Sequence, residues 1–204
     1  MNIGGTGHMK SHRRTTARAL LAVAAALVAA TLAAYFWGGS NGGLVVMNQV
    51  HGHFVGMGWV TLVALVGGIL LGARKTATRL ALGLPVAILG VMVMSLATML
   101  AMLAGGQEQT QSLTAPGRDD RRLVVEEGSA MIDPLWYVYV QQGSWPRERR
   151  WAVGYFNGDA TDNELREAVW TAPDRIRLTT SGGVVHEVTV APGGRPDQVV
   201  SAGW

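Results

Sequence analysis

Three long apolar stretches, at residues 19–37, 54–73 and 80–104, follow one another in the first half of the chain. A helix needs about 20 apolar residues to cross the roughly 30 Å hydrocarbon core of a bilayer. The pattern therefore predicts three transmembrane helices, in a membrane region at 19–104. These stretches contain no Asp, Glu, Lys, Arg or His, which argues against an ion or proton pathway formed by this chain alone.

The second half of the chain changes to short apolar–polar alternations, which are typical of half-buried β-strands. The strongest signal is a hairpin in which 175–180 and 184–190 flank the turn 181–183, whose two glycines suit a tight reversal. We also expect one helix at 162–170, because Asp162 precedes an apolar pair spaced four residues apart and is suited to capping it. Three further strands are expected at 123–126, 136–141 and 151–156.

These elements predict the fold class, which is a membrane α region followed by a small, strand-rich α+β domain at 121–204. Residues 105–120 between them are rich in Gly, Gln, Ser and Thr and lack apolar periodicity. We therefore interpret 105–120 as a linker. The domain is close to the lower size limit for an independent core without disulfides, and the chain has no cysteine.

Acidic residues are absent from the first 107 residues, and all fourteen lie after them. The basic residues of the first half form two clusters, one at 10–18 and one at 74–79, between the second and third apolar stretches. Lys and Arg concentrate on the cytoplasmic side of membrane helices. The distribution therefore predicts a cytoplasmic basic tail at 1–18 and an extracytoplasmic C-terminal domain, in a multi-pass protein of the cell membrane.

The first apolar stretch also has features of a signal peptide, because a basic segment precedes it. Its best small-x-small cleavage site, at 31–33, is weak, and the apolar run continues to Trp37. We favour an uncleaved anchor. Cleavage, and a start at Met9 rather than Met1, remain open, and cleavage would not change the sidedness of the downstream segments.

Small residues recur at a spacing of four in the first two apolar stretches. Such residues let helix backbones approach closely in lipid, where packing drives helix association. The pattern predicts helix-packing faces, either within the chain or against a partner. The residues concerned are Ala22, Ala26, Ala30 and Ala34 in the first stretch and Gly68 and Gly72 in the second.

Two groups of residues are weak candidates for metal ligands. His51 and His53 are two residues apart, so a strand or turn would direct both imidazoles the same way. Asp159 and Asp162 belong to a cluster of oxygen donors of the kind that calcium prefers. Interfacial histidines commonly bind no metal, and the residues around Asp159 are also ordinary turn formers. We expect no metal and no cofactor.

A possible recognition surface consists of Trp145, Arg147, Arg149 and Arg150, beside several other aromatic residues. Exposed aromatic and arginine side chains are enriched at protein interfaces. The alternative is that the rings belong to the core and the arginines to a solvated hairpin loop.

No phosphate-binding glycine loop, nucleophile elbow or zinc-protease helix occurs in the sequence, so we do not expect an enzyme. The expected function is a non-catalytic binding or assembly role for a membrane protein that displays a small extracytoplasmic domain. Its partners are expected to be the lipid bilayer and another membrane or envelope protein, or a second copy, and no nucleic acid. The alternative is an accessory subunit of a transport or secretion complex that acts through its transmembrane helices.

Overall fold

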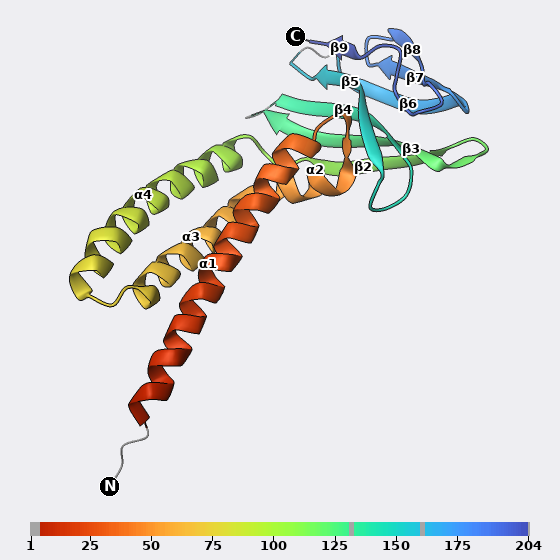
Figure 1. Ribbon diagram of the computed structural model, residues 1–204. Helices are drawn as coiled ribbons and strands as arrows, with labels where there is room; N and C mark the ends of the chain where they lie inside the picture. Colours follow the sequence, from red (N-terminus) through yellow and green to blue (C-terminus); the bar gives the residue numbers. More distant parts are fainter. Residues whose placement is uncertain (1–4, 131–132, 160–161, 204) are drawn as a thin grey trace. The chain divides into compact units, whose positions relative to one another are not determined.

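The computed structural model describes residues 5–130, 133–159 and 162–203 (Figure 1). Over these residues the chain forms four helices and nine strands. The order along the chain is α1, β1, α2, α3 and α4, followed by β2 to β9. Helices therefore dominate the first half and strands the second, and β1 is the one strand that interrupts the helices.

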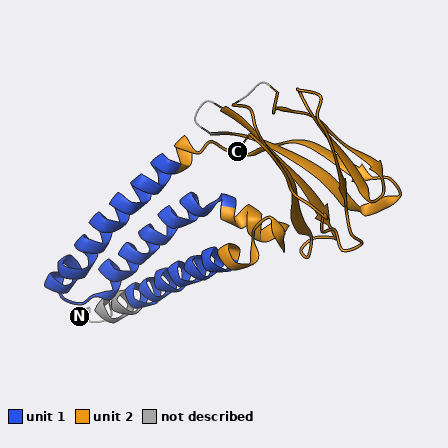
Figure 2. Cartoon of the chain, turned by 90° about the horizontal axis from the view of Figure 1, so that it is seen from above, with its two compact units in different colours: residues 1–33, 52–100 blue, residues 34–51, 101–204 orange. Residues whose placement is uncertain are grey.

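The chain divides into two compact units, which Figure 2 shows in different colours. The helical unit comprises residues 1–33 and 52–100, and the sheet unit comprises residues 34–51 and 101–204. The segment between the first two long helices thus belongs to the same unit as the C-terminal strands.

The helical unit is built from three long helices: α1 (Gly5–Trp37), α3 (Phe54–Gly72) and α4 (Thr76–Leu103). Each is long and apolar enough to span a membrane. The three predicted helices are therefore confirmed as helices. The bounds of α3 and α4 lie within four residues of the predicted ones, whereas α1 begins fourteen residues before its predicted start at residue 19. Their length and composition indicate a membrane protein.

Helix α3 packs against both of its neighbours through glycines. A Cβ atom added at Gly68 would lie 2.7 Å from Cγ of Leu21 in α1, and one at Gly58 would lie 2.5 Å from Cε of Met94 in α4. The indole N–H of Trp59 also donates a 3.1 Å hydrogen bond to the hydroxyl of Thr98. The absence of a Cβ at Gly58 and Gly68 is what permits these close contacts.

The structure separates the predicted packing residues. Gly68 is buried, and a Cβ at Gly72 would lie 3.6 Å from the Cβ of Ala17, so both glycines face α1. In α1, however, Ala22 and Ala26 are exposed, whereas Ala17 and Ala24 are 3% and 4% exposed. Ala30 is half-buried and Ala34, which belongs to the sheet unit, is buried.

A spacing of seven, rather than four, explains the buried alanines of α1. Four residues carry a side chain about 40° beyond a full helical turn, whereas seven residues fall only about 20° short of two turns. A row at spacing four therefore rotates away from a neighbouring helix. Ala17 and Ala24, seven residues apart, stay on the packed side of α1.

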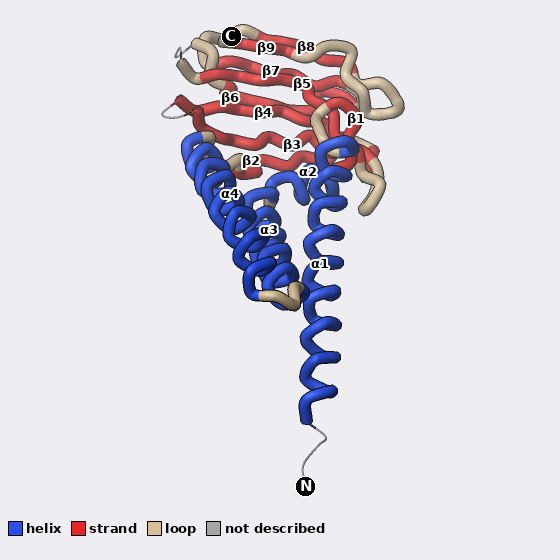
Figure 3. The backbone as a smooth tube through the Cα atoms, turned by 60° about the vertical axis from the view of Figure 1, so that its left-hand side comes forward, coloured by secondary structure: helices blue, strands red, loops and turns tan. Residues whose placement is uncertain are grey.

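The sheet unit contains two β-sheets (Figure 3). The first has the strand order β1-β5-β4-β3-β2, with the short strand β9 pairing with β5, and the second has the order β6-β7-β8. All pairings are antiparallel except that of β9 with β5. The strands of the first sheet are β1 (Asn41–Leu44), β2 (Glu108–Ala115), β3 (Arg118–Ala130), β4 (Asp133–Gln142), β5 (Arg149–Asn157) and β9 (Val200–Ala202). Those of the second are β6 (Leu165–Ala172), β7 (Arg175–Thr180) and β8 (Val185–Thr189).

A continuous apolar core is formed by residues of both sheets. Val138 and Val140 of β4 are fully buried, as the predicted alternation of this strand requires. The predicted hairpin is also confirmed, because β7 and β8 flank a turn in which Gly183 has a φ of 81°. The core comprises Leu123, Val125, Val138, Val140, Val153, Phe156, Ala168, Ile176, Leu178, Val188, Val190 and Val200.

Two local predictions for the second half are wrong. The expected linker at 105–120 contains β2 and the start of β3. The helix expected at 162–170 is absent among the residues described there, and β6 occupies its second half. The expected strands at 123–126, 136–141 and 151–156 all lie within longer strands. The domain is therefore a β-sandwich, and the short helix of its unit, α2 (Val45–Gly52), comes from the segment between α1 and α3.

Strand β1 links that segment to the C-terminal domain, which the sequence does not predict. Leu44 pairs with Arg149 and Asn41 with Trp151 of β5. The amide of Ala152 donates a 2.6 Å hydrogen bond to the carbonyl of Ser40. Residues 40–44 are thus an integral part of the sheet.

Candidate functional site

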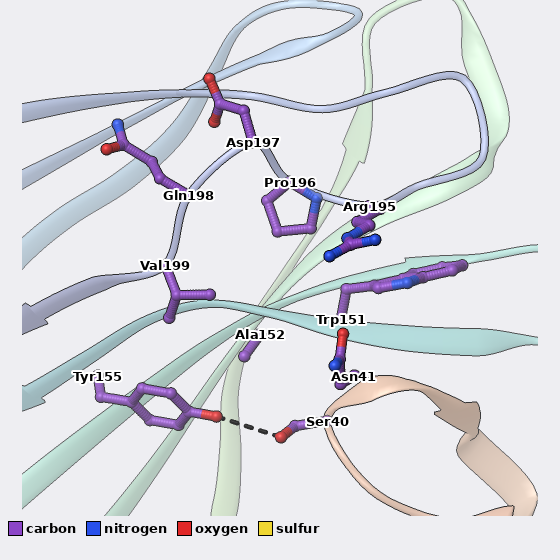
Figure 4. Close-up of a pocket in the computed structure, with 10 residues that line it drawn as sticks. All are labelled: Ser40, Asn41, Trp151, Ala152, Tyr155, Arg195, Pro196, Asp197, Gln198 and Val199. Atoms are coloured by element: carbon purple, nitrogen blue, oxygen red, sulfur yellow. Dashed lines mark hydrogen bonds between the residues drawn. The ribbon is translucent and has the colours of Figure 1, made fainter.

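A cavity of about 370 Å³ lies along the edge of β5 (Figure 4). Strand β4 occupies one edge of β5, so β1 and β9 must share the other edge. Strand β1 pairs with 149–151 and β9 with 154–156, and the cavity lies where these two short strands leave a gap. Its lining residues are Ser40, Asn41, Trp151, Ala152, Tyr155, Arg195, Pro196, Asp197, Gln198 and Val199.

Two aromatic side chains of β5 line this cavity. The hydroxyls of Tyr155 and Ser40 are hydrogen-bonded at 3.2 Å, which connects β5 to the residue that precedes β1. The Trp151 ring has Gly194 beside it, where φ is 89° and an added Cβ would lie 2.6 Å from the ring. Glycine at this position therefore permits both the turn and the close approach of the backbone to the indole.

The opposite wall is a segment held in place by its own side chains. The carboxylate of Asp197 accepts a 3.0 Å hydrogen bond from the amide of Thr189, and the amide of Gln198 donates a 2.9 Å hydrogen bond to the carbonyl of Glu187. Arg195 is exposed, and none of the ion pairs found within 5–130, 133–159 and 162–203 involves it. The cavity thus offers an indole, a phenol, an amide and a guanidinium, a set suited to binding a polar ligand.

A second, smaller cavity of about 230 Å³ lies between α2 and the same sheet. Arg150 and Glu126 form a two-bond ion pair at 3.1 and 3.0 Å, and the Arg150 guanidinium lies 3.6 Å from the centre of the Tyr139 ring. Burial raises the pKa of Tyr139 to about 12. Next to this pair, Arg122 is bonded to Glu148.

Helix α2 begins at this charged cluster. The amide of Val45 donates a 2.9 Å hydrogen bond to the carbonyl of Glu148. Asn48 and Gln49 of α2 line the cavity together with the charged residues of the sheet. The contacts thus attach the segment that follows β1 to β5 as well.

A further buried charge, Arg121, joins the two sheets. Its side chain has no exposed surface and donates hydrogen bonds to the side chain of Gln142 and to the carbonyls of Pro173, Ala191 and Pro192, at 2.7 to 3.2 Å. Burial lowers the pKa of Arg121 from its usual value. Since its acceptors belong to three separate segments, Arg121 fixes the β8–β9 connection against β3 and β4.

The predicted recognition surface is divided by the structure. Trp145 is 77% exposed, and Arg147 and Arg149 are also exposed. Arg150 is only 4% exposed and is bonded to Glu126, so it is not part of this surface. Alternation along β5 accounts for the difference, because Arg149 and Arg150 point to opposite faces of the sheet.

The candidate metal ligands do not come together. His51 lies in α2 and His53 is the residue before α3, so the two do not share one strand or one turn. Asp159 lies beside Asp133, and a hydrogen bond between their carboxyls raises the pKa of Asp133. Among residues 5–130, 133–159 and 162–203, no group of three or more His, Asp or Glu residues is arranged to hold a metal ion.

Asp162 has a different partner from the predicted one. Its carbonyl accepts a 3.0 Å hydrogen bond from the amide of Gly182 in the β7–β8 turn, and no helix begins there. The turn chemistry expected near Asp159 is present, because its amide donates to the Asn157 side chain at 3.1 Å.

The sequence-based interpretation missed Ser40, Asn41 and Arg195, which line the larger cavity. Asn41-Gly42-Gly43 does carry a turn-like signal, but it gives no indication that β5 is the partner. No protein-family model, curated protein or solved structure matches this chain.

Proposed function

We propose that this chain is a membrane-anchored binding module whose β-sandwich lies outside the cytoplasm. Strand β1 carries the proposal: it lies between two helices that are long enough to cross a membrane, yet it is hydrogen-bonded into the C-terminal sheet. The module has two connections to the membrane region, through the β1–α2 segment and through α4.

The pairing of β1 with β5 supports the proposed topology independently of charge. Two strands of one sheet lie on the same side of a membrane, because the pairing cannot continue through lipid. Of the three helices between β1 and the other strands, only α3 and α4 are long enough to cross a membrane, and two crossings return the chain to the same side. The basic clusters at 10–18 and 74–79 then favour a cytoplasmic N-terminus and an extracytoplasmic sheet unit.

The larger cavity is the proposed binding site. Ser40 and Asn41 form part of its wall and follow the end of α1, at Trp37, by three and four residues. A ligand or partner segment in the cavity would therefore contact residues that directly follow α1. We assign this module a role in binding or assembly and no chemical reaction.

A second candidate function uses the helices instead. Ala22, Ala25, Ala26 and Ala29 are all exposed on α1, so a row of small residues is open to another helix. Small residues of this kind favour helix association in lipid. An accessory subunit acting through its helices would use this surface and leave the cavity empty.

The pairing of β1 with β5 is testable by a disulfide, because the chain has no cysteine. Leu44 and Arg149 are partners across β1 and β5, and cross-strand Cα distances of about 4.5–5.5 Å fall within the disulfide range. We expect the double variant Leu44→Cys/Arg149→Cys to oxidise to an intramolecular disulfide in native membranes. The matched pair Leu44→Cys/Val185→Cys, with Val185 in the other sheet, should stay reduced; equal oxidation of both pairs would contradict the pairing.

Sidedness is tested with a membrane-impermeant maleimide on intact cells. A cysteine at Val185, which is exposed, should react without permeabilisation, whereas one at Lys75, in the α3–α4 turn, should react only after it. The reverse pattern would overturn the topology.

Photocrosslinking distinguishes the two candidate functions. A photocrosslinking residue at Arg195 should capture a partner if the cavity is the binding site, and one at Ala22 should capture it if the helices are.

A further inference from the structure

Trp145 is the most exposed aromatic side chain among the described residues. It is 77% exposed, compared with 73% for Phe36, 71% for Tyr35, 63% for Trp37 and 39% for Phe54. The other four lie at the ends of helices that are long enough to span a membrane. Trp145 alone belongs to a strand connection, in the loop between β4 and β5. An indole so fully exposed to water is costly unless something covers it.

The loop that carries Trp145 has a hydrogen-bonded backbone. The amide of Gly143 donates to the carbonyl of Asp120 and that of Arg147 to the carbonyl of Ser144, each at 2.8 Å. Arg147 in the loop and Arg149, the first residue of β5, are exposed, whereas Glu148 between them is buried and paired with Arg122. The loop and the start of β5 therefore expose one large amphipathic ring and two cations.

This loop lies next to the segment that joins α1 to α3. Arg149 pairs with Leu44, and the carbonyl of Glu148 accepts the hydrogen bond from Val45 that begins α2. The seven residues from Trp37 to Leu44 span at most about 23–25 Å when extended. Helix α2, with eight residues, adds only about 12 Å before α3 begins. These chain lengths set an upper limit on the distance from Arg149 to the end of α1 and to the start of α3.

We propose that the β4–β5 loop docks onto the surface of the membrane in which α1, α3 and α4 are embedded, with Trp145 in the interfacial layer and Arg147 and Arg149 beside anionic lipid headgroups. Tryptophan prefers this layer because its ring is apolar and its N–H is polar. Each arginine near an anionic surface favours the docked loop by about fivefold. This inference rests on the membrane anchoring in the proposed function.

The test places a nitroxide label next to the indole without removing it. The exposed Ser144 is changed to Cys in the full-length chain, which is reconstituted into phosphatidylcholine vesicles with or without phosphatidylglycerol. Collisions of the label with oxygen report on lipid and collisions with a nickel chelate report on water. Matched labels at Val184, exposed on the β7–β8 turn, and at Leu89, exposed in α4, serve as water and lipid controls.

Docking predicts that the label at Ser144 favours oxygen over nickel in the anionic vesicles, unlike the label at Val184. In the variant Trp145→Ala, the label at Ser144 should become as accessible to nickel as the label at Val184. In the variant Arg147→Glu, the loss of the positive charge should weaken docking by about fivefold or more, in anionic vesicles only. Two results would overturn the inference: nickel access equal to that of Val184, or shielding from both reagents, which indicates a protein partner. A lipid-buried label at Leu89 in those cases leaves the membrane anchoring intact, whereas nickel access at Leu89 would refute the anchoring itself.

Discussion

The helical unit and the sheet unit bury their residues in opposite ways. In α4 only Gly83 is buried, and the buried residues described in α1 and α3 are alanines and one glycine. The sheet unit has a core of large aliphatic side chains and Phe156 instead. The helices thus leave many large apolar side chains exposed, as expected of helices that are long and apolar enough to span a membrane.

The hydrogen-bond partners of polar side chains also differ between the helical unit and the sheet unit. In the helical unit, the hydroxyls of Thr31, Thr61 and Thr98 each donate to the carbonyl four residues earlier in their own helix. In the sheet unit, buried polar side chains such as Arg121 and Arg150 are bonded across strands far apart in sequence. Local bonding leaves helices free to pack in lipid, whereas long-range bonding fixes a single arrangement of strands.

The largest expected effect comes from Arg121→Met, which removes the charge that joins the two sheets. The carbonyls of Ala191 and Pro192 would lose their donor, and the free energy of unfolding should fall by about 3–5 kcal/mol. Denaturation of the full chain in detergent, followed by tryptophan fluorescence, measures the loss. The control Arg166→Met, at an exposed position of β6, should change stability by less than about 0.5 kcal/mol. Similar losses for both variants would show that Arg121 has no special role.

The next effect concerns the buried ion pair beneath α2. Arg150→Met leaves Glu126 without its partner and should cost about 3 kcal/mol, because an uncompensated charge stays buried. The double variant Glu126→Gln/Arg150→Met should recover part of this loss. Arg177→Met breaks an exposed pair with Glu187 in the second sheet and should cost about 0.5 kcal/mol or less. The same fluorescence assay compares them, and equal costs for Arg150 and Arg177 would contradict the burial argument.

A smaller effect is expected in the helical unit. Gly68→Val introduces a side chain whose Cβ would lie 2.7 Å from Leu21, so α1 and α3 must separate, at a cost of about 1–3 kcal/mol. Loss of helical circular dichroism during titration with a denaturing detergent measures this change. Gly56→Val, at a position with open space around it, is the control. The sheet unit should unfold at an unchanged midpoint in both variants, and a shift there would refute separate cores.

The last effect is a pH dependence of the sheet unit. The pKa of Tyr139 is about 12 in the folded chain because the phenol is buried, whereas an unfolded tyrosine ionises near pH 10. The unfolded state therefore loses its proton first, and stability should decrease as the pH rises from about 10 to 12. Ultraviolet absorbance of phenolate should show a late-ionising component that Tyr139→Phe removes. An absorbance titration that Tyr139→Phe leaves unchanged in shape would contradict this.

The sequence predicts the helical unit better than the sheet unit for a physical reason. About 20 consecutive apolar residues are a local signal, and the helices satisfy their own hydrogen bonds. The hairpin of β7 and β8 is equally local, because Gly183 marks its turn. These elements need no knowledge of distant partners.

The missed strands lack such signals. Strand β2 is an edge strand in which Leu113 and Ala115 are the only large apolar or fully buried side chains, so its composition is that of a linker. In β6, an irregularity of register between Leu165 and Glu167 interrupts the alternation, and the remaining spacing of four between Leu165 and Val169 imitates a helix.

The larger cavity was beyond prediction because its walls come from three distant parts of the chain. Ser40 precedes the second long helix, Trp151 lies in the middle of the domain, and Arg195 lies near the end of the chain. Only the pairing of β1 with β5 brings the first of these to the other two. For Trp145, in contrast, the sequence left both an exposed and a buried ring open, and the structure shows it 77% exposed.

The position of β1 also determines when the sheet can form during synthesis. Gly42 and Arg149, which the fold brings together, are 107 residues apart. At usual rates of translation, β1 waits about 5–20 s for its partner, during which α3 and α4 must emerge. An unpaired strand can pair with a wrong strand of the same or another chain. Because β1 has only four residues, few such hydrogen bonds can form. The sheet is therefore completed only after the last two long helices have been made, so that completion of the sheet reports that both have been synthesised.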